Sequence, residues 1–344
     1  MEMEEGRDEE RAAEYCVTGG TGLVGANLVK ALLDKGYRVR TTVRDPENAE
    51  KVGFLWDLNE RASREGRLKI VKADLMEEGS FDDAVEGVDG VFHTASPVLV
   101  PKDRDIRETL IDPCVKGTLN VLRSCRRAAV KRVVLTSSCS SIRYRHDATR
   151  VSPLNESHWT DLDYCKRYNL WYPYAKTVAE QEAWKWAGEE SGATELVVVN
   201  PSFVVGPLLT PRPTSTLRLL LGIVKGMVGE YPNKTVGFVH VDDAVRAHLV
   251  AMETPRASGC RLICSTTVAH FSQIIHMLRA KYPSYPYESK CSNEEGDDGP
   301  HSLDCTKIME LGFSPPFISL PQMLDDFILS FRQKGFLSDP LMDI

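Results

Sequence analysis

Tyr172 and Lys176 lie four residues apart in the stretch LWYPYAK. On a helix this spacing places both side chains on one face, about 6 Å apart at Cβ. An ammonium this close to a phenol is expected to lower the tyrosine pKa below its usual value of about 10. Pro173 fits only near a helix start, where its missing N–H has no intrahelical acceptor. The pair therefore predicts a general acid at a helix entrance, where a small molecule can reach it.

The same spacing occurs in ordinary amphipathic helices that carry an exposed lysine, so the pair needs support from elsewhere in the chain. A run of hydroxyls, SSCSS at residues 137–141, follows the strand expected at Arg132–Thr136. Such a run can also be only a polar loop or a helix cap. Together with Tyr172 and Lys176, one of these serines becomes a candidate to hold a carbonyl oxygen.

A glycine-rich segment near the N-terminus predicts a dinucleotide-binding unit. A strand at Glu14–Thr18 leads directly into GGTGLVG, and a helical pattern and a second strand follow. This order of elements within about thirty residues is typical of dinucleotide binding. Gly19 is expected to permit the tight turn, Gly22 to let the backbone approach a pyrophosphate, and Gly25 to allow close helix–strand packing.

The residues after the second predicted strand favour a dinucleotide that carries a 2′-phosphate. NAD-dependent proteins usually place an acid at this point to hold the ribose hydroxyls. Here Arg44 stands 19 positions after Gly25, and Lys51 follows seven residues later. A guanidinium and an ammonium attract a phosphate, whereas the neighbouring Asp45 is typical of a turn or helix cap. The alternative is that Arg44 is a solvated surface charge; we expect NADPH.

Strands and helices alternate to about residue 200, which predicts an α/β fold with a doubly wound parallel sheet of the Rossmann type. Strands are expected at 68–71, 88–93 and 132–136, and a long helix at about 104–130. Ligands of such sheets bind outside the carboxyl ends of the strands. Two sets of residues stand at such ends: Asp74 and Leu75, then Thr94, Ala95 and Ser96. His93 is expected to pack or to hydrogen-bond within its strand.

Beyond residue 200 the alternation breaks down and proline and glycine become frequent, which predicts a smaller substrate-binding cap. A structural hydrogen bond beside Asp242 is expected for His240, and a charged surface loop for residues 293–299. The expected divisions are a disordered acidic tail at 1–13, a Rossmann domain at 14–200 with about 236–255, a cap at 201–235 and 256–335, and a C-terminal tail at 336–344.

Composition narrows the class of protein. The 344 residues carry a net charge of −7, which argues against binding a nucleic acid over a broad surface. No apolar run is long enough to span a membrane, and the N-terminus lacks the apolar core of a secretory signal. The nine cysteines show no metal-ligand spacing and are typical of reduced thiols. We therefore expect a cytoplasmic protein without a metal.

The combination of TGGTGLVG, Arg44 with Lys51, TSS ending at Ser138, and Tyr172 with Lys176 resembles the extended short-chain dehydrogenase/reductases. VRTTVRDP, KADL, GVFHTASPV, TSSCSSIRY, NPSFVVGPLL and GFVHVDD resemble the plant dihydroflavonol and cinnamoyl-CoA reductases, over about residues 14–335. Within that group the chain is most similar to tetraketide α-pyrone reductases, in VGFLWDL, RLKIVKADL, NESHW, YCKRYNLWY and KCSNEEGD. Those enzymes reduce a carbonyl of a polyketide α-pyrone with NADPH, on the route to pollen-wall sporopollenin.

The resemblance implies roles for the matching residues. Ser138 would hydrogen-bond the substrate carbonyl, Tyr172 would protonate it, and Lys176 would lower the Tyr172 pKa and bind the nicotinamide ribose. The implied cofactor contacts, besides Tyr172 and Lys176, are Gly19, Gly22, Leu23, Val24, Gly25, Arg44, Lys51, Asp74, Leu75, Thr94, Ala95, Ser96, Pro201, Ser202, Val204, Ser215 and Thr216. The candidate substrate contacts are Arg143, Tyr144, Trp171, Phe203 and Leu208.

Departures from these relatives narrow the substrate. Cinnamoyl-CoA reductases have a run N-W-Y-C-Y-G-K where this chain has NLWYPYAK, which counts against a thioester. Dihydroflavonol reductases present an asparagine where this chain has Arg143, which counts against a flavonoid. The relay asparagine of many short-chain enzymes is replaced by Cys114, so the route of proton resupply stays open.

The rival functions are a cinnamoyl-CoA or dihydroflavonol reductase, a nucleotide-sugar epimerase that retains NAD, and a non-catalytic NADPH-binding regulator. Arg44 and Lys51 argue against the epimerase, and the retained Tyr172 with Lys176 argues against the regulator. The expected partner is a small polyketide. The resemblance also leaves room for association with other pathway enzymes and for loose contact with the endoplasmic reticulum surface.

Overall fold

A parallel sheet of seven strands forms the centre of the protein, in the order β3-β2-β1-β4-β5-β6-β9. A computed structural model describes residues 12–60, 66–97, 105–189 and 194–338. The strands are β1 Glu14–Thr18, β2 Arg38–Val43, β3 Leu68–Lys72, β4 Gly90–His93, β5 Arg132–Thr136, β6 Glu195–Pro201 and β9 Arg261–Cys264. Runs such as the VVL of β5 and the VVV of β6 are buried on both faces, as expected of parallel strands. The predicted Rossmann-type sheet is confirmed.

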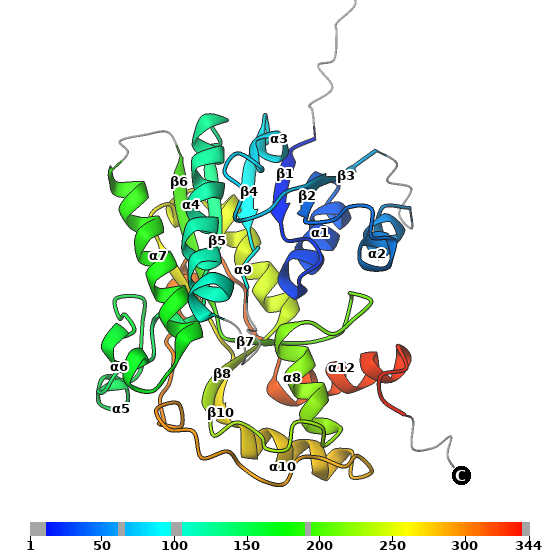
Figure 1. The fold of residues 1–344 in the computed structure, drawn as a ribbon, viewed down its shortest axis with the longest axis vertical. Helices are drawn as coiled ribbons and strands as arrows, with labels where there is room; N and C mark the ends of the chain where they lie inside the picture. Colours follow the sequence, from blue (N-terminus) through cyan, green and yellow to red (C-terminus); the bar gives the residue numbers. More distant parts are fainter. Residues whose placement is uncertain (1–11, 61–65, 98–104, 190–193, 339–344) are drawn as a thin grey trace, which may run out of the picture.

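Helices cover both faces of this sheet (Figure 1). One face carries α4 and α7, which pack side by side, and the other carries α1 and α9, which contact one another. The helices and short helical turns are α1 Leu23–Asp34, α2 Ala49–Glu60, α3 Asp82–Val85, η1 Arg107–Ile111, α4 Asp112–Arg127, η2 Cys139–Ser141, α5 Ala148–Val151, α6 Leu162–Arg167, α7 Trp171–Glu189, α8 Ser215–Val224, α9 Val241–Glu253, η3 Pro255–Ala257, α10 Phe271–Lys281, α11 Thr306–Glu310 and α12 Leu320–Gln333. The predicted helix at 104–130 is a π-helical turn, η1, followed directly by α4. None of the helices in the described part of the chain combines the length and apolarity that crossing a bilayer requires.

A second sheet of three strands lies below the carboxyl ends of the large sheet in Figure 1. Its strands are β7 Phe203–Val205, β8 Thr235–His240 and β10 Thr267–His270, with β8 in the centre. β7 runs parallel to β8, and β10 runs antiparallel to it. Together with α8, α10 and α12, this sheet forms the cap that was expected after residue 200.

Two of the predicted domain boundaries are wrong. Residues 256–335 were assigned wholly to the cap, but β9 pairs in parallel with β6 and is the seventh strand of the large sheet. The crossover through α9 returns the chain to that sheet, and the fully buried Leu262, Ile263 and Cys264 need cover on both faces. Conversely, β8 was assigned to the Rossmann domain but lies in the small sheet. Segments of the Rossmann domain and of the cap therefore alternate along the second half of the chain.

The predicted tails fall largely outside the described residues. Of the acidic segment 1–13, only residues 12 and 13 are described. Of the C-terminal segment 336–344, residues 336–338 are described. Leu337 is buried and its backbone N–H donates to Phe331 O (3.2 Å), so the ordered cap extends past residue 335.

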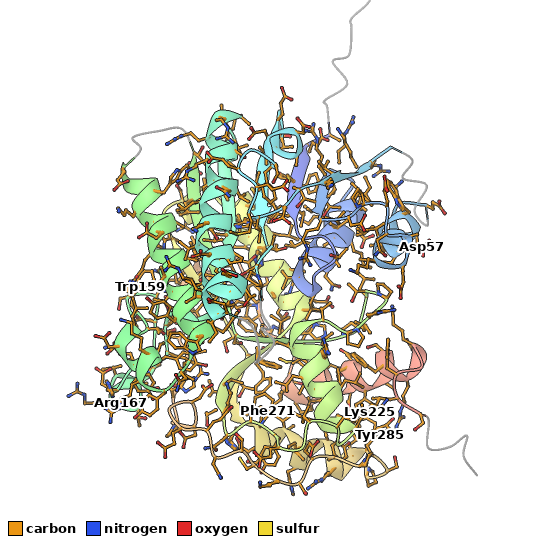
Figure 2. The ribbon with its side chains drawn as sticks, viewed as in Figure 1. Asp57, Trp159, Arg167, Lys225, Phe271 and Tyr285 are labelled. Carbon is orange, nitrogen blue, oxygen red and sulfur yellow. The ribbon has the colours of Figure 1, made fainter. Side chains whose placement is uncertain are left out.

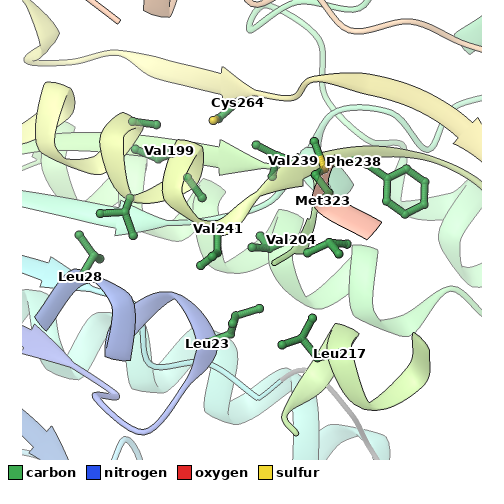
Figure 3. Packing of buried hydrophobic residues seen from close by; sticks show 14 of the residues in the cluster. Leu23, Leu28, Val199, Val204, Leu217, Phe238, Val239, Val241, Cys264 and Met323 are labelled. Carbon is green, nitrogen blue, oxygen red and sulfur yellow. The ribbon is translucent and has the colours of Figure 1, made fainter. Parts of the chain in front are cut away.

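One hydrophobic cluster joins the large sheet to the cap (Figure 3). It contains Leu23 and Leu28 of α1, Val199 of β6, Val204 of β7, Leu217 of α8, Phe238 and Val239 of β8, Val241 of α9, Cys264 of β9 and Met323 of α12. Because this core is continuous, the cap is fixed against the strand ends rather than joined to them by a loose linker.

A buried carboxylate ties α7 to the large sheet. Glu180 of α7 is fully buried, and both of its carboxylate oxygens accept hydrogen bonds. Oε2 accepts hydrogen bonds from Ser137 Oγ (2.5 Å), Ser141 Oγ (2.5 Å) and Asn200 Nδ2 (2.9 Å). Oε1 accepts one from Arg261 Nε of β9 (2.5 Å). The carboxylate thus links a helix, the loop after β5, and strands β6 and β9.

The partner guanidinium of Arg261 is satisfied on its other side as well. It donates to Glu156 O (2.8 Å) and His158 O (2.7 Å), and it lies 3.7 Å above the Trp159 ring centre. A buried ion pair with complete hydrogen bonding of this kind is costly to break, because either charge alone would be stranded away from water.

We predict that Glu180→Gln lowers the free energy of unfolding by about 3–5 kcal/mol, the usual cost of leaving one buried charge without its partner. Urea unfolding followed by circular dichroism measures this loss. The matched control is Glu189→Gln on the same helix, where the carboxylate is largely exposed and pairs with Lys185 at 3.9 Å. Equal unfolding midpoints for the two variants would contradict the prediction.

Candidate active site

Tyr172, Lys176 and Ser138 come together at the carboxyl end of β5. All three line one cavity of about 150 Å³ between the large sheet and the cap. Tyr172 and Lys176 come from the first two turns of α7, and Ser138 comes from the loop after β5. The arrangement unites the hydroxyls of the serine run with the tyrosine–lysine pair that lies more than thirty residues later in the chain.

The start of α7 places the tyrosine as its sequence predicts. The helix begins at Trp171, so Tyr172 is its second residue and Pro173 its third. Pro173 is buried, and its carbonyl accepts a hydrogen bond from Thr177 Oγ1 (2.7 Å). Because proline in a first turn removes no intrahelical bond, the helix can start here and leave Tyr172 at its entrance.

The loop after β5 holds Ser138 through its backbone. The Ser138 carbonyl accepts hydrogen bonds from Ser141 Oγ (2.8 Å) and Asn200 Nδ2 (3.2 Å), two side chains that also contact Glu180. Its Oγ accepts a hydrogen bond from Ser140 N–H (3.1 Å). The Ser138 O–H can therefore still donate, either to the Tyr172 side chain or to a ligand in the cavity.

The expected effect of Lys176 on the Tyr172 pKa is wrong for this structure. Burial raises the pKa of Tyr172 well above its ordinary value, the nearby Cys114 adds to this, and a hydrogen bond with the Ser138 side chain opposes it. Lys176 Nζ donates to Thr136 O (2.9 Å), and burial lowers the pKa of Lys176, an effect that Cys114 and Glu180 oppose. Desolvation thus outweighs any attraction between the ammonium and a phenolate. The phenol keeps its proton at neutral pH, which is the form that a proton donor needs.

The glycine-rich turn leaves room for a ligand at the start of α1. Gly19 has φ +75°, and a Cβ on it would lie 2.9 Å from Ala95 Cα. A Cβ on Gly25 would lie 2.4 Å from Gly19 O, so only glycine lets α1 pack this close to the turn. The N-cap residue Gly22 has no side chain to occupy the first N–H groups of α1. Gly22, Leu23, Val24 and Gly25 line the cavity with backbone, which fits a pyrophosphate.

The remaining cofactor candidates fall into two groups. Thr94, Ser96, Pro201, Ser202, Val204 and Thr216 line the same cavity. The others lie outside its lining: Gly19, Ala95, Arg44, Lys51, Asp74 and Leu75, while the Ser215 side chain is outside the described part of the chain. Arg44 and Lys51 are exposed, and Arg44 directly follows β2.

Asp74 and Leu75 follow β3, the neighbour of β2, so they share a sheet edge with Arg44. The Asp74 carboxylate accepts a hydrogen bond from Met76 N–H (2.8 Å) and closes a turn. Leu75 accepts one from Asn120 Nδ2 through its carbonyl (2.9 Å). This edge lies at the carboxyl ends of the strands and carries the positive charge of Arg44, which are the two features that a phosphorylated ribose requires.

Two histidines have the structural roles that were expected. His93 is buried in β4, where its Nδ1 pairs with Thr18 Oγ1 (2.8 Å), and burial lowers its pKa to about 3. His240 caps α9, with its Nδ1 accepting from Asp242 N–H (3.1 Å). Both rings are fixed by these bonds. Among the described residues, no cluster of three or more His, Cys, Asp or Glu side chains could hold a metal ion.

A second and larger hollow, of about 580 Å³, lies beside the cavity. Tyr172 lines both spaces, so it stands at their junction. Trp171, a candidate substrate contact, lines the larger hollow. The rest of its lining is Arg167, Tyr168, Asn169, Leu170, Pro173, Lys234, Glu294, Glu295 and Asp297.

The other candidate substrate contacts do not line either space. Arg143 and Tyr144 are buried behind the larger hollow, where both bond to Asp297. Phe203 packs edge-on against Phe271 in an aromatic cluster of the cap. Leu208 is buried and borders a separate surface hollow beside α1 and α9.

Sequence reasoning missed Lys234 and Asp297. The segment 293–299 was expected to be a charged surface loop, yet the Asp297 side chain is only 1% exposed. Its partner Arg143 lies 154 residues earlier, so no local pattern marks the pair. A single acidic residue among exposed ones shows no periodicity, and only the tertiary contact distinguishes it.

Comparisons with known proteins agree with this site. Residues 15–263 match the NAD dependent epimerase/dehydratase family. Tetraketide alpha-pyrone reductase 2 of Arabidopsis thaliana is 64% identical over 327 residues, which cover 94% of this chain and all of that relative.

Solved structures show the same fold. Vestitone reductase from alfalfa is 30% identical, with a TM-score of 0.74 over 94% of this chain and 99% of that one. A yeast methylglyoxal/isovaleraldehyde reductase complexed with NADPH is 25% identical, with a TM-score of 0.78 over 94% of this chain and 100% of that one.

These matches confirm the expected oxidoreductase class and a nicotinamide dinucleotide as the cofactor. The glycine turn and the uncapped start of α1 are where such a dinucleotide fits. On this evidence the chain belongs to the NAD dependent epimerase/dehydratase family and is one of its reductases.

Proposed function

We propose that this protein uses NADPH to reduce the side-chain ketone of a tetraketide α-pyrone to a hydroxyl. The observation that carries the proposal is the position of Tyr172, which lines both the dinucleotide cavity and the larger hollow next to it. A proton donor at this junction can reach a carbonyl that enters from the hollow. The named activity of the 64% identical Arabidopsis relative supplies the substrate class.

The residues of the cavity divide the reaction between them. NADPH supplies the hydride that adds to the carbonyl carbon. Tyr172 gives its phenolic proton to the carbonyl oxygen, so that the ketone becomes an alcohol and the tyrosine a phenolate. The O–H of Ser138, which lies within hydrogen-bond reach of Tyr172, would turn to hold the same oxygen, and Ser141 and Asn200 fix the Ser138 backbone for this role.

Lys176 then stabilises the phenolate that Tyr172 becomes after the reaction, rather than the phenol that is present before it. With the phenol protonated, its ammonium is bound to Thr136 O. Once Tyr172 has lost its proton, the nearby cation offsets the new negative charge in a site with little water. Proton resupply needs a further donor, because Tyr172 must regain its proton before the next turnover.

The preference for NADPH rests on the edge beyond β2. Arg44 directly follows that strand and is exposed there. Lys51 is also exposed and lies in the first turn of α2, the next helix. A carboxylate at this position would repel a 2′-phosphate, whereas these two cations attract it.

We place the reaction in the synthesis of sporopollenin precursors for the pollen exine. The protein would work in the cytoplasm, in loose association with the endoplasmic reticulum surface and with other enzymes of the pathway. The near full-length similarity to a plant tetraketide alpha-pyrone reductase supports this setting. Tracing a tagged protein in anther cells tests it.

We predict that Tyr172→Phe lowers the turnover number by two or more orders of magnitude, the usual contribution of a general acid. NADPH binding, measured by fluorescence titration, should largely survive. The matched control is Tyr174→Phe on the same helix, because Tyr174 packs against Trp171 and lines neither space. Undiminished ketone reduction by the Tyr172 variant would refute its role.

We predict that Arg44→Asp lowers the ratio of kcat/KM with NADPH to kcat/KM with NADH by about tenfold to a hundredfold, the value of a charged hydrogen bond. Steady-state kinetics with both cofactors measures this ratio. Arg38→Asp is the control, since Arg38 is exposed at the opposite end of the same strand. An unchanged ratio in the Arg44 variant would rule out contact with the 2′-phosphate.

A further inference from the structure

The larger hollow is lined by charged side chains and by Tyr172, the candidate proton donor. Its lining includes five charged side chains, from Arg167, Lys234, Glu294, Glu295 and Asp297. We propose that this hollow binds the ionised 4-hydroxy-2-pyrone ring of the substrate, with Lys234 as the cation that holds the ring oxyanion. This inference rests on the proposed function and names how the substrate is oriented in that site.

The chemistry of the substrate class requires an acidic ring. A tetraketide has four carbonyl groups on alternate carbons. Closing an α-pyrone uses the first as the lactone carbonyl and the third as the ring oxygen's enol, which leaves the second as a 4-hydroxyl. That hydroxyl is conjugated to the lactone carbonyl, as in a carboxylic acid, and it is ionised at neutral pH. The fourth carbonyl stays outside the ring, one methylene away, as the ketone to be reduced.

Two cations pair with one buried carboxylate at the wall of the hollow. Asp297 is the only carboxylate that bonds to two cations there among the described residues: Arg143 pairs with Oδ1, and Lys234 Nζ lies 3.1 Å from Oδ2. Tyr144 also donates to Oδ2 (3.0 Å). One carboxylate cannot neutralise both cations, so a cation is left over to bind an anionic ligand.

Of these two cations, Lys234 is the one that can meet a ligand. Arg143 is buried behind the wall and does not line the hollow, whereas Lys234 lines it and its side chain is 32% exposed. Arg143 thus holds Asp297 in place, and Asp297 in turn orients the lysine. A partly exposed ammonium on a flexible stem can pair with Asp297 and still donate to an oxyanion.

The other charged groups that face the hollow do not cancel this site. Glu294 and Glu295 are exposed, so water screens them. Arg167, also exposed, projects from the end of α6 in Figure 2 and adds a second positive charge. A polar, charged chamber of this kind suits an ionised ring and disfavours an alkyl chain, because charged groups lose hydration against apolar surface.

The ring position also presents the ketone to the catalytic residues. Trp171 and Leu170 supply apolar wall to the hollow and directly precede Tyr172 in the chain. A planar ring held beside Trp171 extends its C6 side chain toward the phenol, at the junction of the two spaces. The side-chain ketone then meets Tyr172, and the rest of the chain is directed away from the charged wall.

A pair of substrates isolates the ring charge. One is a 4-hydroxy-2-pyrone with a 2-oxoalkyl group at C6, and the other is its 4-methyl ether, which has the same ketone but no ionisable hydroxyl. We expect Lys234→Gln to raise KM for the hydroxypyrone about tenfold or more, the usual loss for a hydrogen bond to a charged group. Its kcat/KM for the methyl ether should match that of the unmodified protein, which also shows that the variant is folded.

Two further variants sharpen the result. Lys234→Arg should restore most of the hydroxypyrone affinity, because it keeps the positive charge. Lys225→Gln, a change of an exposed lysine after α8 that is labelled in Figure 2 and lines neither space, should change neither substrate's kinetics.

Several outcomes would overturn the inference. Equal losses on the two substrates, or no loss on either, would show that Lys234 does not bind the ring oxyanion. If the unmodified protein reduces neither pyrone, the proposed function itself fails and the inference fails with it. A protein that reduces both pyrones equally well, with or without Lys234, keeps the function and refutes only the orientation.

Discussion

The buried carboxylate of Glu180 is the contact on which the geometry of the site depends. It accepts hydrogen bonds from the loop that follows β5, from β6 and from β9, so it fixes α7 relative to three parts of the large sheet. The catalytic candidates stand on the two elements that this carboxylate joins: Ser138 on the loop, and Tyr172 with Lys176 on the helix. Holding these groups to within a fraction of an ångström requires rigid support, and a satisfied buried network provides it.

Three polar residues of α7 follow one another along a single helix face. Tyr172, Lys176 and Glu180 are spaced by four residues, so they point to the same side at increasing distance from the helix entrance. Burial lowers the pKa of Lys176, and Cys114 and Glu180 oppose that shift, so these two groups favour an ammonium beside the tyrosine. The helix thus carries the buried carboxylate, the lysine and the tyrosine in this order toward its N-terminal end.

Much of this arrangement follows from local sequence patterns. β5 has the predicted bounds, and Pro173 correctly places the start of α7. The errors come from properties that local patterns do not contain. The predicted division placed β9 in the cap, because its partner β6 lies some sixty residues earlier and no local pattern links the two strands. The pKa of Tyr172 depends on how much surrounding protein excludes water, and neither its neighbours in the chain nor the i, i+4 spacing specifies that.

The division of the site into two spaces explains how one reaction can serve many substrates in this family. The cavity beside the glycine turn is lined by that turn and by the candidate catalytic residues, which leaves little that can vary without loss of the dinucleotide. The larger hollow is built from loops of the cap and from α6, and loops tolerate substitution. Because Tyr172 lines both spaces, the proposed mechanism predicts that a change in the outer walls alters which ketone reaches the phenol and leaves proton donation unchanged. In the proposed mechanism the reacting groups stand on α7 and on the loop after β5, whereas substrate choice depends on charges in the walls of the larger hollow, such as that of Lys234.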